Sequence, residues 1–141
     1  MAIHFHPQPG TILICDFQGM QEPEMVKRRP VVVISPRLRN RGNLVSVVPL
    51  SSSRPDDSYP YHHQLRFDPP LPAPYDDPAC WVKGDMIYTV AFYRLFVPQL
   101  GKDPKTGKRL SDVRVLADGD LTSVMSCVLN GIGLGHLTDH L

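Results

Sequence analysis

Polar side chains with reactive or anion-binding groups stand where three apolar segments of the chain begin or end. Arg29 comes directly before one apolar run, Ser51 follows the next, and Lys83 and Asp85 follow a third. A guanidinium binds anions, while an amine and a carboxylate can release or take up protons. Each residue also has an ordinary role, as a strand-end ion pair, a turn hydroxyl or a turn former. Together, beside apolar strands, they indicate a site carried by a sheet.

The basic residues of the chain are concentrated in one segment beside this set. The whole sequence of 141 residues has 15 Lys and Arg against 14 Asp and Glu, so its net charge of +1 neither favours nor excludes a nucleic-acid partner. Residues 27–41, however, contain no acid and carry Lys27, Arg28, Arg29, Arg37, Arg39 and Arg41. The local charge is therefore more informative than the total.

Other reactive residue types give weaker signals. His4 with His6, and His136 with His140, have spacings that can share a metal ion, but both pairs are terminal and lack a third ligand, so we predict no metal and no cofactor. The three cysteines are odd in number and far apart, which suits a reducing cytoplasm rather than a disulfide framework. We also expect no secretory signal and no membrane span, since no apolar run approaches about 20 residues.

Short apolar segments separated by turns predict a mainly β fold. We expect one domain over residues 1–141, with strands at 11–17, 31–35, 44–48, 80–83 and 94–97. Seven of the 15 prolines fall between Pro55 and Pro78, so 52–79 is predicted to be a proline-rich surface insertion with one short strand at 64–67. Residues 102–109 have the composition of an exposed turn.

One helix is expected over residues 121–132. Its apolar residues recur at spacings of three and four and comprise Leu121, Val124, Met125, Val128, Leu129 and Ile132. Asp118 is the predicted N-cap, and Gly131 or Gly133 would end the helix. The opposite face carries the small or mildly polar residues Ser123, Ser126, Cys127 and Asn130. Such a face loses little on desolvation, so we predict a homodimer.

The order of these motifs resembles the MazF/PemK (Kid) family of type II toxin–antitoxin toxins. The residues that carry the resemblance are Gly10-Thr-Ile12, Glu24, Arg29-Pro30 with Val31–Ile34, Val47-Val-Pro-Leu-Ser-Ser52, Lys83–Val90 with Arg94-Leu95, and the helix 121–132. The resemblance spans nearly the whole chain apart from the insertion. It implies an SH3-like small barrel of the PemK/MazF type, with a C-terminal helix.

The resemblance also implies an activity, namely metal-independent, sequence-selective endonucleolytic cleavage of single-stranded RNA by its own 2′-OH, which leaves a 2′,3′-cyclic phosphate. Arg29 would stabilise the charge on phosphorus, and Ser51 would orient the phosphate. Asp85 would be the base, and Lys83, beside the cation of Arg29, would be the acid. The residues expected to bind RNA are Glu24, Arg28, Arg37, Arg39, Arg41, Ser52, Trp81 and Tyr88. The implied partners are single-stranded RNA, a cognate antitoxin protein and a second copy of the chain.

The sequence departs from the family pattern at Tyr88, Ala91, Pro23 and Thr11, which leaves other functions open. One alternative is a barrel with weak or no catalysis that binds RNA or a protein such as gyrase, as the related-fold CcdB toxins do. Another is an adaptor for proline-rich peptides. An adaptor would need an aromatic-lined groove, and only 8% of the residues are aromatic, with no cluster before Trp81.

Overall fold

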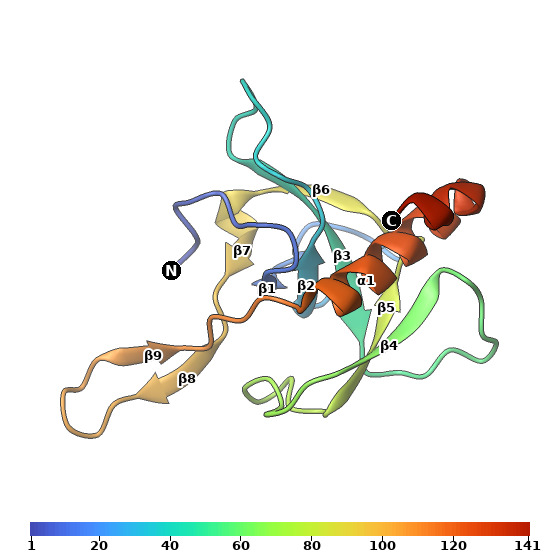
Figure 1. Cartoon of the computed structure of the whole chain (residues 1–141). Coiled ribbons are helices and arrows are strands. Elements are labelled where there is room, and N and C mark those ends of the chain that lie inside the picture. Colours follow the sequence, from blue (N-terminus) through green and yellow to red (C-terminus); the bar gives the residue numbers. More distant parts are fainter.

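The computed structural model describes all 141 residues and is dominated by antiparallel strands with one α-helix (Figure 1). The strands are β1 (Ile12–Cys15), β2 (Arg29–Val33), β3 (Leu44–Ser51), β4 (His62–Arg66), β5 (Ala79–Lys83), β6 (Tyr88–Ala91), β7 (Leu95–Phe96), β8 (Gln99–Lys102) and β9 (Arg109–Ser111). The helix α1 spans Asp118–Gly131, and short 3-10 helices occupy Phe92–Arg94 and Gly135–His140. The mainly β class with a C-terminal helix agrees with the sequence-based prediction.

The eight-residue strand β3 is the centre of the main sheet. Along one edge it pairs with β2, and along the other its first half pairs with β6 and its last residues with β5. The seven strands follow the order β4-β5-β3-β2-β1-β7, with β6 beside β3. Because β4 and β7 are not paired with each other, backbone hydrogen bonds do not close this small barrel.

Consecutive valines of the central strands point into two different apolar cores, because successive side chains of a strand alternate between its faces. Val31 and Val47 belong to one cluster, which also contains Phe17 and Leu95. Val32 and Val48 belong to the other, together with residues of β4, β5 and α1. Burial on both faces explains why these strands appear as unbroken apolar runs in the sequence.

Helix α1 covers the second core with much of the predicted face, since Val124 is buried there and Met125 and Val128 pack against it. Its buried residues are Val124 and Cys127, whereas Ile132 lies beyond the helix and is 53% exposed. The placement of Cys127 on the outward face is therefore wrong. Cys127 is buried because α1 closely approaches Gly84, where a Cβ would lie only 2.6 Å from the Cβ of Cys127.

The predicted N-cap of this helix is also wrong. Asp118 is the first helical residue, and Ala117 occupies the cap position without a side-chain hydrogen bond. Asp118 and Asp120 instead place two carboxylates in the first turn, where the partial positive charge of the helix dipole favours them. At fourteen residues, α1 falls short of what a membrane-crossing helix needs, and no other helix is long and apolar enough.

The proline-rich segment is more than the surface insertion that we expected. It contains the whole of β4, and Leu65, Phe67 and Leu71 are buried in the second core. The prolines prevent a helix or a central strand locally, yet the short apolar stretches between them reach the core.

Strands β8 and β9 form a separate two-stranded sheet that projects from the molecule (Figure 1). All seven of their residues are exposed. The predicted turn at 102–109 connects them, but the sequence did not reveal the two strands. The short strand β6 was also missed.

Candidate functional site

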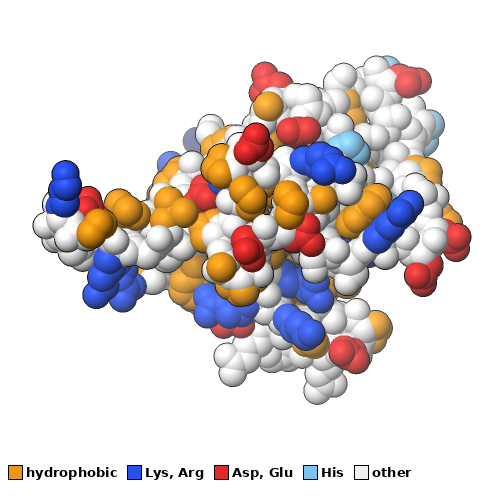
Figure 2. All heavy atoms as spheres, turned by 90° about the horizontal axis from the view of Figure 1, so that it is seen from below, with side chains coloured by type: hydrophobic (Ala, Val, Ile, Leu, Met, Phe, Trp, Pro, Cys, Tyr) orange, Lys and Arg blue, Asp and Glu red, His pale blue; other side chains and the backbone are white.

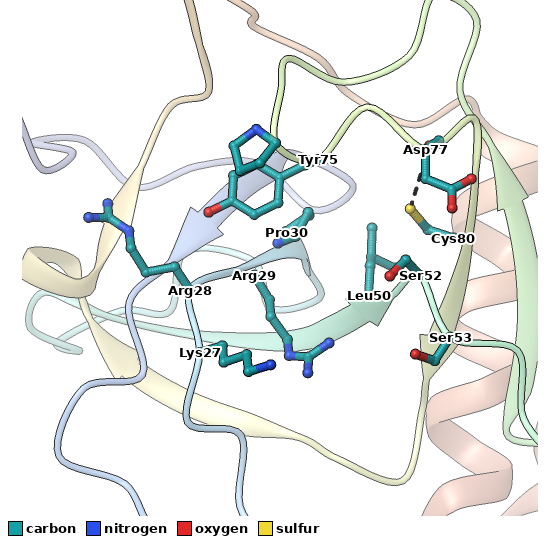
Figure 3. A pocket seen from close by; sticks show the side chains of 11 residues that line it. Lys27, Arg28, Arg29, Pro30, Leu50, Ser52, Ser53, Tyr75, Asp77 and Cys80 are labelled. Carbon is teal, nitrogen blue, oxygen red and sulfur yellow. Dashed lines mark hydrogen bonds between the residues drawn. The ribbon is translucent and has the colours of Figure 1, made fainter.

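A cavity of about 260 Å³ opens where β2 begins and β3 ends (Figure 3). It is lined by Lys27, Arg28, Arg29, Pro30, Leu50, Ser52, Ser53, Pro74, Tyr75, Asp77 and Cys80. Its walls thus come from the basic segment, from the turn after β3 and from the proline-rich segment.

Arg29 lies half-buried at the mouth of this cavity because it is the first residue of β2, where its backbone pairs with Cys15. Its Nε is buried and has no hydrogen-bond partner. Three cations line the cavity against the single carboxylate of Asp77, and the only ion pair of the structure lies elsewhere, between Arg114 and Asp112. The cavity therefore carries excess positive charge and an unsatisfied donor, both of which favour an anion.

The three serines after β3 have different roles. Ser51 is buried, 6% exposed, and its Oγ accepts a hydrogen bond of 3.2 Å from the backbone N–H of Ser53. Ser51 thus stabilises the turn that presents Ser52 and Ser53 to the cavity, and it does not line the cavity itself. The predicted contact residue Ser52 is in place, whereas Ser51 lies behind it.

Trp81 and Lys83 of β5 lie on the same side of the sheet as Arg29. Ser51 pairs with Trp81. The pairing of β2 with β3 ends at Val31 opposite Pro49, and the same register extended by two residues would bring Arg29 opposite Ser51. Residues directly opposite each other in antiparallel strands share a face, and so do residues two apart along one strand. Arg29 on β2 and Lys83 on β5 are two strand spacings apart across β3, and Lys83 is two residues further along its strand than Trp81. The Cα atoms of Arg29 and Lys83 are therefore about 12 Å apart.

Asp85 lies in the connection 84–87 between β5 and β6 (the bulge), which contains a turn closed by a 3.0 Å hydrogen bond from the Met86 N–H to the Lys83 carbonyl oxygen. Val82 pairs with Leu50 and Tyr88 with Val47, so the five residues 83–87 face only the two residues 48–49. The bulge brings Asp85 against α1, where a Cβ on Gly131 would lie 2.9 Å from the Asp85 Cα.

The surroundings of Asp85 are aromatic. Burial, followed by the negative charges of Asp85 and Tyr59, raises the pKa of Tyr61 above its ordinary value. The Tyr61 ring stacks on Tyr59 with centroids 5.3 Å apart. Asp85 forms no hydrogen bond or ion pair with Arg29 and does not line its cavity. The four predicted catalytic residues thus form two groups, Arg29 with Ser51 and Lys83 with Asp85.

The other expected RNA contacts are dispersed. Arg28 lines the cavity, and its guanidinium lies over the Phe96 ring at 4.7 Å. Glu24 accepts a hydrogen bond from the backbone N–H of Gln21 within a turn. Three further arginines lie in the loop between β2 and β3, at the opposite end of β2 from Arg29, namely Arg37, Arg39 and Arg41.

Tyr88 has a structural role that does not fit the predicted stacking on a base. Its ring packs against Phe17 with centroids 5.1 Å apart, and its hydroxyl accepts a 3.0 Å hydrogen bond from the backbone N–H of Met25. Trp81, in contrast, remains partly exposed on the Arg29 side of the sheet.

Sequence reasoning missed several residues near the site. Tyr75 and Asp77 line the cavity, but they belong to the segment that we expected to be a surface insertion. Ser53 also lines the cavity and directly follows the predicted residues Ser51 and Ser52. His62 pairs with Lys83 across β4 and β5, and its buried Nδ1 has no partner. Only the pairing of β4 reveals this neighbour, because 21 positions separate the two residues along the chain.

One cysteine thiol forms part of the cavity wall. Cys80 lines the cavity, and its Sγ donates a weak hydrogen bond of 4.0 Å to the Asp77 carbonyl oxygen. Burial and, secondarily, Asp77 raise the pKa of its thiol from 9.0 to about 11, so it is neutral at ordinary pH. No group of three or more His, Cys, Asp or Glu side chains is arranged to hold a metal ion.

The fold and cavity define a small β protein with a cation-lined cavity at the ends of its central strands. Residues 8–114 match the family model described as "PemK-like, MazF-like toxin of type II toxin-antitoxin system". The chain therefore belongs to the PemK/MazF toxin family, as its sequence motifs indicated.

Two curated proteins are similar to this chain in sequence. An uncharacterized protein of Haemophilus influenzae is 33% identical over 109 residues, which cover 68% of this chain and 74% of the relative. The uncharacterized protein YifN of Escherichia coli K12 is 31% identical over 121 residues, which cover 67% of this chain and 75% of YifN.

Solved structures share the fold at lower sequence identity. MazF from Deinococcus radiodurans aligns with a TM-score of 0.56 and 21% identity, over 92% of this chain and 99% of that one. An endoribonuclease in complex with its cognate antitoxin from Mycobacterial species aligns with a TM-score of 0.55 and 19% identity, over 92% and 97% of the two chains. These similarities confirm the predicted MazF-type fold.

Proposed function

We propose that this protein is the toxin of a type II toxin–antitoxin system and cleaves single-stranded RNA in the cytoplasm without a metal ion. Membership of the family supports the first part. The observation that carries the second is the cationic cavity, in which the Arg29 Nε is buried without a partner. A phosphodiester supplies the anionic acceptor that this donor lacks.

The proposed reaction transfers the phosphoryl group within the RNA. The 2′-oxygen attacks the adjacent phosphorus and loses its proton to a base, while the bond from phosphorus to the 5′-oxygen breaks and that oxygen receives a proton. The products are a 2′,3′-cyclic phosphate and a 5′-hydroxyl. Arg29 stabilises the additional negative charge on the phosphoryl oxygens, and Ser52 and Ser53 offer hydroxyl donors. Ser51 acts by holding their turn.

Lys83 is the proposed proton donor to the 5′-oxygen. It shares a face of the sheet with Arg29 at a Cα separation of about 12 Å, so that two long side chains can reach one phosphate from opposite sides. Asp85 is the base that the family resemblance implies, and His62, across from Lys83, is a second candidate. Loss of activity in Asp85→Asn but not in His62→Gln would assign the base to Asp85, and the opposite result would assign it to His62.

The direct test is incubation of the purified protein with a long single-stranded RNA in EDTA, followed by mapping of the ends. We expect cyclic phosphate and 5′-hydroxyl ends at a restricted set of sequences. Arg29→Ala should lower the rate by about 100-fold or more, because one donor to the transition state is lost. Arg66→Ala is the matched control, since Arg66 is exposed and does not line the cavity. Equal rates for both variants would exclude Arg29 from the mechanism.

We further propose a homodimer that binds a cognate antitoxin. Ser123, Ser126 and Asn130 remain partly exposed on α1, as the sequence suggested. Beyond them, the chain exposes a run of large apolar residues, Ile132, Leu134, Leu137 and Leu141. Light scattering at micromolar protein should give twice the chain mass. A monomer that still cleaves RNA would show that one chain contains the complete site.

A second candidate function is RNA binding without cleavage. It is favoured by the separation of Asp85 from the Arg29 cavity and by the structural use of Tyr88. This function would be established if wild-type protein binds RNA, Arg29→Ala weakens that binding, and the RNA stays intact in the assay above.

A further inference from the structure

The Arg29 cavity is one end of a longer groove. It shares Arg28 and Tyr75 with a second cavity of about 380 Å³, which extends to Phe96 and Pro98. The second cavity shares Val97 and Gln99 with a third cavity of about 460 Å³. The third includes Phe5, Arg109 and Ser111, so the groove runs from the end of β3 to strand β9.

The groove has cations at its two ends and aromatic rings between them. Lys27, Arg28 and Arg29 stand at the first end and Arg109 at the other, against the single acid Asp77. Three aromatic side chains line the path between them, namely Tyr75, Phe5 and Phe96, and the Arg28 guanidinium lies over one face of the Phe96 ring. Positive charge that follows a backbone, together with rings on which bases stack, is the combination used by proteins that bind single-stranded nucleic acids.

The base of the β8–β9 hairpin, next to this groove, is closed by hydrogen bonds between the hairpin's own two ends. The backbone N–H of Asp112 donates a 2.8 Å hydrogen bond to the Pro98 carbonyl. The Gln99 Nε2 donates to the Val97 carbonyl at 3.0 Å and to the Ser111 hydroxyl at 3.1 Å. These bonds hold the two ends of the hairpin together, and all of its strand residues are exposed.

The side chains on the hairpin are free to bind a partner. Lys102, Lys105, Lys108 and Arg109 form no ion pair, since the only one in the structure joins Arg114 and Asp112. Figure 2 shows the hairpin projecting at one side of the molecule with Lys and Arg side chains around it. An isolated two-stranded ribbon is only marginally stable in water, and a bound partner would order it further.

We propose that the groove from Ser53 to Arg109 binds single-stranded RNA and holds nucleotides that flank the cleaved bond. The inference rests on the proposed function for the position of the scissile phosphate at Arg29. An acidic protein segment could pair with the same cations, but it would make no particular use of three aromatic rings. The rings therefore favour RNA as the occupant.

The test measures binding of non-cleavable RNA, so its result is independent of catalysis. Fluorescence anisotropy with 2′-O-methyl RNAs of about four and about twelve nucleotides should show tighter binding of the longer RNA to wild-type protein. Phe5→Ala should weaken binding of the longer RNA about fivefold or more and leave the shorter one unchanged. Arg109→Ala should reduce the slope of log affinity against log salt by about 0.7, the value for one phosphate contact on a single strand.

Lys105→Ala is the matched control for Arg109→Ala. Both residues are exposed cations of the same hairpin, but only Arg109 lines the groove. Circular dichroism would establish that Phe5→Ala and Arg109→Ala remain folded. If Lys105→Ala and Arg109→Ala reduce the salt dependence of RNA binding equally, the hairpin contributes only non-specific positive charge. That result would overturn the proposal.

The remaining outcomes separate this inference from the proposed activity. In one outcome, wild-type protein cleaves RNA, but its RNA affinity does not depend on RNA length, on Phe5 or on Arg109. This outcome would overturn the proposed RNA-binding groove and leave the proposed activity intact. Length-dependent binding without cleavage would leave the groove intact and overturn the activity. A last outcome concerns poly-glutamate as a competitor. If poly-glutamate displaces the long RNA, binds more tightly than the RNA does, and loses affinity in Arg109→Ala and Phe5→Ala, the groove would be assigned to an acidic protein partner.

Discussion

The replacement Gly84→Ala tests whether the contact between the bulge and α1 fixes the site. Gly84 lies between Lys83 and Asp85, and a Cβ there would stand 2.5 Å from both the carbonyl carbon and the carbonyl oxygen of Cys127. These are backbone atoms of a helix and cannot turn away as a side chain would. The helix must therefore move by about 1 Å to restore an ordinary contact distance of about 3.5 Å.

The cost follows from what this displacement disturbs. Forcing an extra methyl group into a packed interface costs about 1–3 kcal/mol, and a gap of about 0.5–1 Å removes a quarter to a half of each dispersion contact. Val124 and Cys127, the buried residues of α1, would lose part of their packing. We expect the free energy of unfolding to fall by about 3 kcal/mol, which corresponds to about 10 °C in Tm for a chain of this size.

Urea denaturation followed by circular dichroism measures this change, and RNA cleavage of the folded variant measures displacement of Lys83 and Asp85. Gly119→Ala is the control, since a Cβ there meets nothing within 4 Å and its position is also on α1. That variant should be as stable as wild type or slightly more stable. A free energy of unfolding for Gly84→Ala within about 0.5 kcal/mol of wild type would refute the tight contact.

Three further predictions concern stability. Leu71→Ala should lower the free energy of unfolding in urea by about 2–5 kcal/mol, because this residue of the proline-rich segment is 1% exposed; a smaller loss would make the segment a removable loop. Tyr88→Phe should cost about 1 kcal/mol by leaving the Met25 N–H unpaired, and normal RNA affinity in the folded variant would support the structural role of Tyr88. Burial raises the pKa of Cys127 from 9.0 to about 11, so the unfolded state releases this proton first. Stability should hold up to about pH 9 and fall by roughly 2 kcal/mol for this thiol as the pH rises to about 11, whereas Cys127→Ala should flatten that fall in urea titrations at each pH.

The sequence was sufficient to predict the central strands because both of their faces are buried. Val31–Val33 and the valines of β3 stand out as apolar runs, and turns on either side delimit them. The hairpin strands β8 and β9 gave no such signal, since every residue in them is exposed and their pairing depends on the turn alone. Local sequence patterns therefore reveal strands that are buried in the core and miss strands that pair in solvent.

The candidate site was only partly predictable for a related reason. Arg29 was identifiable because it adjoins a strong apolar run, and its cavity contains the expected Arg28 and Ser52. The distance of Asp85 from that cavity arises from a bulge, which depends on the register of β5 and β6 against β3. Register depends on contacts between segments distant in the chain, so no local motif could reveal it.

The separation of the β8–β9 hairpin from the main sheet has a consequence for how such a protein diversifies. No strand of the hairpin pairs with the seven strands that enclose the two cores, so substitutions at its exposed positions leave the burial of those cores unchanged. Selection can therefore alter the sequence and even the length of this ribbon with little penalty in folding. If the ribbon contacts RNA, homologous toxins can acquire different target preferences while the scaffold and the Arg29 cavity stay the same.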